Sequence, residues 1–149
     1  ALGIGIPAAL TPGNLLWLVA FFIPAYFLYS AIYAALGAGA EDEQHLGQLA
    51  WPILIFLIIP MVMINTFVMT PDSTLSVFFS FFPLTSPIVM LIRVLAAPPA
   101  AWQIAASYAL LVAAVLAAGA LAAKVFRVGI LMTGKRRKLG EILKWVGTK

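Results

Sequence analysis

Residues 77–97 read VFFSFFPLTSPIVMLIRVLAA, and the topology of the chain depends on how this stretch meets the membrane. The stretch has about the 20 apolar residues that a helix needs to cross hydrocarbon. Pro83 and Pro87, however, remove backbone hydrogen bonds in adjacent turns, and unpaired backbone groups in lipid must be covered by protein or water. We therefore interpret residues 77–97 as a re-entrant hairpin, in which residues 78–86 descend, the chain turns at Pro87 and residues 88–97 return.

Arg93 lies in the returning arm and supports the same interpretation. A charged side chain at the middle of a membrane costs roughly 2.5–3.5 kcal/mol on insertion scales. In a returning half-helix, Arg93 would lie near the outer interface or face a wet cavity instead. A snorkelling arginine without a functional role is the alternative interpretation.

The composition places the whole chain in lipid. Of the 149 residues, 64% are hydrophobic and 9% are charged, whereas soluble domains are about half apolar and about a quarter charged. The chain has no cysteine, which excludes disulfides and thiolate chemistry. The acids at 41–43 and His45 are explained better by a solvated loop than by a metal site. We predict an integral membrane protein that is not an enzyme and has no metal or cofactor of its own.

Three further apolar stretches are predicted to be transmembrane helices, namely residues 15–36, 49–69 and 101–123. Asn65, near the end of the second, is an uncharged polar residue that either packs against a neighbouring helix or contacts a solute. The third carries a stripe of small residues four positions apart, which we expect to pack closely against another helix: Ala105, Ala109, Ala113 and Ala117.

Residues 124–149 carry eight of the nine Lys and Arg residues, and the positive-inside rule places this tail in the cytoplasm. Apolar residues recur at helical spacing near its end, which predicts a short amphipathic helix on the membrane surface. Nucleic acid is not an expected partner, because the charges flank a hydrophobic segment. We expect the following residues at the cytoplasmic membrane surface: Lys124, Arg127, Lys135, Arg136, Arg137 and Lys138.

The topology follows from the hairpin and the tail together. If residues 77–97 are re-entrant, three spans place residues 37–48 inside and residues 70–99 outside. If residues 77–97 cross instead, residues 37–48 move outside. The loops carry too few basic residues to choose between the two arrangements by charge.

Three segments carry a family resemblance. They are FPLTSP at 82–87 with Met90 and Arg93 beyond it, KVFRVGILMTGK at 124–135, and the loop 41–48, which runs from acidic residues to glutamine. With the order of the spans, they resemble the C-terminal half of an ABC-2 type transporter permease, most closely the NatB-like sodium-extrusion branch.

The resemblance implies a six-span permease subunit that dimerises in the cell (inner) membrane and works with a separate ATPase subunit, on which ATP is bound. It implies export of sodium or another small compound by alternating access, with a re-entrant element on the outer side. We expect these residues along the solute pathway or at its gate: Asn65, Thr66, Pro83, Ser86, Pro87 and Arg93. The alternative is a small multi-span membrane scaffold or anchor without transport activity.

Overall fold

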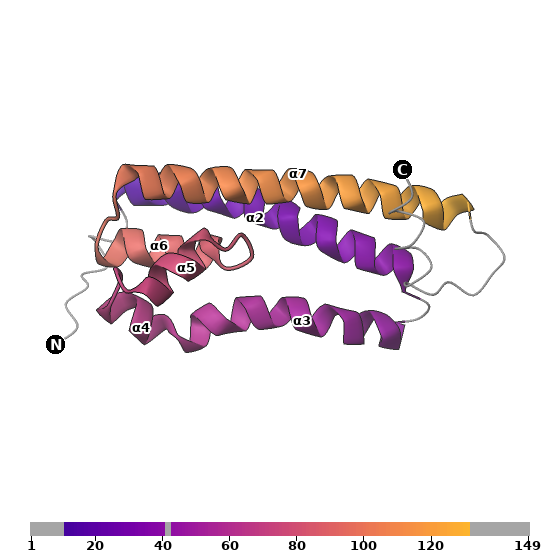
Figure 1. Ribbon diagram of the computed structural model, residues 1–149, viewed down its shortest axis with the longest axis horizontal. Coiled ribbons are helices and arrows are strands. Elements are labelled where there is room, and N and C mark those ends of the chain that lie inside the picture. The colour runs from indigo at the N-terminus through magenta and orange to yellow at the C-terminus, as the bar shows by residue number, and fades with distance from the viewer. Residues whose placement is uncertain (1–10, 41–42, 132–149) are drawn as a thin grey trace.

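Figure 1 shows a computed structural model of the chain, an elongated bundle of helices. The structure describes residues 11–40 and 43–131. Every regular element within these residues is a helix, and the elements are α2 (Pro12–Gly39), α3 (Glu43–Val62), α4 (Ile64–Met69), α5 (Thr74–Phe81), α6 (Ser86–Ala96) and α7 (Ala101–Leu131). Helices α2, α3 and α7 are long and apolar enough to cross a membrane. The predicted all-helical membrane fold with three spans is therefore confirmed.

The bounds of the helices differ from the predicted spans. Helix α7 continues to Leu131, through residues that we assigned to the tail. The predicted span at 49–69 is divided at Met63 into α3 and α4. Pro60 lies three residues before this break and leaves the Phe56 carbonyl without its helical donor, which is a local cause for it. The predicted amphipathic helix near the C-terminus lies outside the described residues.

Helices α5 and α6 form a hairpin. Both of its open ends lie at the end of the bundle where α4 ends and α7 begins, and the connecting turn points toward the middle of the bundle (Figure 1). The turn occupies residues 82–85, so the prediction of a turn at Pro87 was wrong. Pro87 lies instead in the first turn of α6, where a proline loses no helical hydrogen bond and its fixed φ favours helix formation.

Side-chain hydroxyls satisfy the backbone of the hairpin where regular helix ends. Pro83 has no N–H to offer the Phe79 carbonyl, and the Thr85 hydroxyl donates to that carbonyl at 2.7 Å instead. Ser73 caps α5, because its Oγ accepts from the Ser76 N–H at 3.2 Å. These hydroxyls therefore pair backbone groups within the hairpin, as a non-helical segment in an apolar medium requires.

The buried core lies between α2, α6 and α7. Helix α2 packs along α7 over most of its length, and α6 covers the pair near the hairpin end. The buried cluster consists of Phe21, Leu28, Met90, Val94, Ile104 and Leu111. Helix α7 contributes to it through a different face from the alanine stripe, whose members are all exposed in the described chain: Ala105, Ala109, Ala113 and Ala117. Contact between this stripe and another helix stays a prediction.

Leu111→Ala tests this packing, because Leu111 is fully buried against α2 and α6. We expect the detergent-solubilised full-length protein to lose roughly 1–3 kcal/mol of stability, since lost packing remains costly even where lipid replaces water. The matched control is Leu110→Ala, whose side chain is 46% exposed. Equal shifts of the thermal unfolding midpoint in the two variants would contradict the assignment of this face.

Candidate functional site

Arg93 is the centre of a polar network at the open end of the hairpin. Its side chain is fully buried. Nε donates to the Pro71 carbonyl at 2.7 Å, and Nη1 donates to Ser80 Oγ at 2.9 Å. Nη2 donates to Gln103 Oε1 at 2.8 Å and to Asp72 Oδ1 at 3.3 Å. Arg93 therefore joins the segment before α5, α5 itself and the start of α7.

The network balances the charge of Arg93 mainly with neutral acceptors. Asp72 is its partner in an ion pair, but the Asp72 side chain is 82% exposed, and ion pairs with exposed carboxylates contribute little. Arg93 also lies in the last turn of α6, where the helix dipole favours a cation. Because its donors are engaged inside the protein, Arg93 holds the hairpin in place and does not snorkel.

Ser107 extends the network one turn further along α7. Its hydroxyl donates to the Ser80 carbonyl at 2.6 Å, while Ser80 Oγ donates to the Val77 carbonyl at 2.8 Å and accepts from Arg93. Helix α5 is thus bonded to α7 through buried polar groups as well as through packing.

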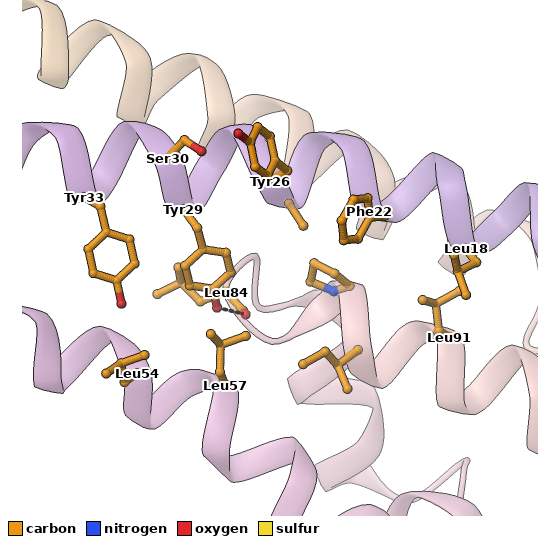
Figure 2. Close-up of a pocket in the computed structure, with 13 residues that line it drawn as sticks. Leu18, Phe22, Tyr26, Tyr29, Ser30, Tyr33, Leu54, Leu57, Leu84 and Leu91 are labelled. Atoms are coloured by element: carbon orange, nitrogen blue, oxygen red, sulfur yellow. Dashed lines mark hydrogen bonds between the residues drawn. The ribbon is translucent and has the colours of Figure 1, made fainter.

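A cavity of about 710 Å³ lies between α2, α3, the hairpin turn and the start of α6 (Figure 2). Its size is within the range of roughly 300–1,000 Å³ that is usual for sites binding small molecules. Within residues 11–40 and 43–131, no charged side chain lines it. The lining residues are Leu18, Phe22, Ala25, Tyr26, Tyr29, Ser30, Tyr33, Leu54, Leu57, Leu84, Pro87, Ile88 and Leu91.

The two ends of the cavity differ in polarity. Leu18, Phe22 and Leu91 make one end entirely apolar, whereas the hydroxyl-bearing residues of α2 gather toward the other end (Figure 2). Tyr29 donates its hydroxyl hydrogen to the Leu84 carbonyl at 2.6 Å, which ties α2 to the hairpin turn. Tyr33 points from α2 into the space toward α3 (Figure 2).

The structure does not bring the predicted pathway residues together at one place. Pro87 lines the cavity. Pro83 lies in the hairpin turn, and Arg93 belongs to the polar network. Ser86 is fully buried at the start of α6, and within the described part of the chain its Oγ has no hydrogen-bond partner. The remaining two are exposed on α4, away from the cavity lining: Asn65 and Thr66.

The basic residues predicted at the membrane surface are only partly described. Lys124 and Arg127 are exposed on the last turns of α7. The other four lie outside the described residues: Lys135, Arg136, Arg137 and Lys138.

Sequence reasoning missed the tyrosines of the cavity and the partners of Arg93. Tyr26, Tyr29 and Tyr33 follow an i, i+3, i+7 pattern, which places three hydroxyls on one side of a helix. The sequence contains a weaker indication of the hydrogen-bond partners of Arg93. A charge within an apolar stretch requires acceptors, but the sequence did not indicate that Gln103 would supply one.

Comparisons with known proteins identify the family. The profile described as ABC-2 family transporter protein matches residues 1–124. The chain belongs to the ABC-2 transporter family. This family consists of membrane transport subunits that are not themselves catalytic and that generally work with an ABC ATPase.

Two curated relatives are similar to this ABC-2 chain. It is 25% identical over 129 residues to the uncharacterized protein MJ1024 of Methanocaldococcus jannaschii, a match that covers 87% of the chain and 32% of the relative. It is 23% identical over 121 residues to the uncharacterized protein YhaP of Bacillus subtilis, covering 81% and 29% respectively. The chain thus spans about a third of the length of these relatives. No solved structure matches it.

Arg93→Met tests the polar network. The variant leaves the Pro71 carbonyl and Gln103 without their donor, and we expect a loss of roughly 2–4 kcal/mol in the stability of the full-length protein. Arg93→Lys should restore only part of it, because an ammonium cannot reproduce the planar fork of the guanidinium. Thermal unfolding in detergent measures both variants. Arg127→Met is the control for loss of an exposed charge, and an equal effect of Arg127→Met and Arg93→Met would refute the role of the network.

Proposed function

We propose that the chain is the C-terminal part of a permease subunit of an ATP-binding-cassette exporter. Membership of the ABC-2 family and three helices that are apolar enough to span a membrane support this proposal. The observation that carries it is the α5–α6 hairpin, which is held at one end of the bundle and bounds an uncharged cavity between the spans. A scaffold needs neither feature.

The proposed topology places the hairpin on the outer side of the cell membrane. The basic residues at and beyond the end of α7 favour a cytoplasmic C-terminus. Helix α7 begins at the hairpin end of the bundle (Figure 1), so the open ends of the hairpin would face outward. The turn at 82–85 would then enter the membrane without crossing it, which is the re-entrant arrangement.

The proposed partners are an ABC ATPase, which binds and hydrolyses ATP, and a second permease subunit. The exposed alanine stripe of α7 supports close contact with a further helix, because small residues let helix backbones approach in lipid. That helix belongs either to the preceding part of the same permease or to the second subunit.

The lining of the cavity favours a largely apolar solute. Membership of the NatB-like branch would make sodium the solute, but the lining residues offer a cation no carboxylate. Transfer of an ion into apolar surroundings without such compensation is strongly unfavourable. A solute with an apolar body matches this lining without that cost.

Cysteine labelling tests the topology, because the chain itself contains no cysteine. Thr74→Cys and Ala100→Cys mark the two open ends of the hairpin, and Gln44→Cys marks the start of α3. All three positions are exposed. In intact cells producing a full-length protein freed of other cysteines, an impermeant maleimide should label the first two positions, and Gln44→Cys only after permeabilisation. Labelling of only one hairpin end would mean that residues 77–97 cross.

Co-reconstitution tests the permease function itself. The full-length protein and the ABC ATPase that co-purifies with it are placed in proteoliposomes, where the permease should raise the rate of ATP hydrolysis above that of the ATPase alone, because transport and hydrolysis are coupled in an exporter. An ATPase variant that cannot hydrolyse ATP is the control. If no ATPase associates and hydrolysis is unchanged, the scaffold alternative is correct.

A further inference from the structure

We propose that the cavity between α2, α3 and the α5–α6 turn binds a single-chain amphiphile, a molecule with one hydrocarbon tail and one small uncharged polar end. This inference rests on the proposed permease function and names the solute class of the exporter.

The shape of the cavity carries the first step. Its lining extends along α2 from Leu18 to Tyr33, which is about 22 Å at a rise of 1.5 Å per residue. A volume of about 710 Å³ spread over this length makes the cavity elongated, and it is partly open, since Leu18, Phe22 and Tyr26 are exposed. An extended tail fits such a shape, whereas a compact solute would leave much of it empty.

The polarity of the lining carries the second step. The end at Leu18, Phe22 and Leu91 offers only hydrocarbon and an aromatic ring, which match a tail (Figure 2). The other end offers the hydroxyl of Tyr33, which points into the space toward α3 and can donate to or accept from one small polar group (Figure 2). Among the described residues, those that line the two ends carry no charge, so we infer an uncharged hydroxyl or amide as the polar end of the ligand.

The position of the polar end carries the third step. Tyr33 lies six residues before the end of α2 at Gly39, or about 9 Å from it along the helix. Tyrosine is enriched at this depth, where its ring is in the apolar region and its hydroxyl reaches the interface. In the proposed topology, the polar group of the ligand lies near the cytoplasmic interface and its tail points toward the hairpin.

The contacts between the helices provide a route of entry. Helix α2 contacts α3 at few positions, whereas it packs along α7 over most of its length. Within the described residues, the space between α2 and α3 is therefore not closed by packing. A tail that enters sideways reaches Leu84 and Pro87 of the hairpin. Because the Tyr29 hydroxyl holds the Leu84 carbonyl, the ligand contacts the point at which the hairpin is bonded to α2.

Photolabelling tests the proposal. The full-length protein is placed in nanodiscs and labelled with a long-chain fatty alcohol that carries a diazirine in its tail, and the modified peptides are identified by mass spectrometry. We expect labels on α2 and α3 residues that line the cavity, and competition by unlabelled long-chain alcohol. Competition by a short-chain alcohol at equal concentration should be at least about tenfold weaker, because each buried methylene contributes about 0.8 kcal/mol.

Filling variants distinguish the cavity from the general lipid surface. Ala25→Trp and Leu57→Trp place an indole in the cavity from α2 and α3, and each should lower labelling of the lining at least about tenfold, equivalent to 1.4 kcal/mol. Val19→Trp is the control, since Val19 is 52% exposed and outside the lining. Gel filtration verifies that each variant is folded. The second filling variant decides the test if the first does not fold.

Two results would overturn the inference. Labels spread evenly over exposed faces, and unchanged by either filling variant, would mean ordinary contact with bilayer lipid. Absence of labels from the lining would mean that another part of the longer protein fills the cavity. The labelling needs neither ATP nor the ATPase, so the proposed permease function can fail while the amphiphile still binds. If ATP-dependent export is observed without labelling, only the solute class is wrong.

Discussion

A guanidinium buried away from water needs acceptors on several sides, and the arrangement of the hairpin follows from how Arg93 obtains them. The acceptors come from Pro71, Ser80 and Gln103, which lie before α5, within it and at the start of α7. None of the three is charged, so the interaction depends on geometry more than on attraction between ions. Displacing any of these segments would leave part of a buried cation unsatisfied, a cost of several kcal/mol. The hairpin position is therefore strongly determined.

The remainder of the hairpin is stabilised by packing of aromatic rings against the surrounding helices. Phe82 meets Phe56 of α3 with ring centroids 5.2 Å apart, and Phe81 meets Trp102 of α7 at 6.2 Å. In lipid, burial of such rings gains little from the hydrophobic effect, so shape and contact between them matter most. These contacts fix the turn from the α3 and α7 sides, while the Tyr29 hydroxyl fixes it from α2. The hairpin turn therefore forms a wall of the cavity that is held from several sides, whereas the gap between α2 and α3 has few contacts.

The sequence was sufficient for the helical membrane fold and its three spans, because long uncharged stretches have few alternatives in lipid. Prolines at 83 and 87 indicated a broken segment but not the position of the turn, since proline suits both a turn and the first turn of a helix. The role of Arg93 could not be predicted, because its acceptors are up to 22 residues away in the chain. The cavity depends on the relative positions of α2, α3 and the hairpin, which local patterns do not specify.

Helix α7 is a single rod of 31 residues, about 46 Å long at 1.5 Å per residue, against a hydrocarbon thickness of about 30 Å. Its first turns carry Gln103 and Ser107, which are bonded to Arg93 and Ser80, and its last turns carry the exposed Arg127. An unbroken hydrogen-bonded helix is stiff along its axis. An axial displacement of the Arg127 end would therefore move Gln103, which accepts from Arg93, and Ser107, which donates to Ser80. In this way α7 links the two ends of the bundle mechanically.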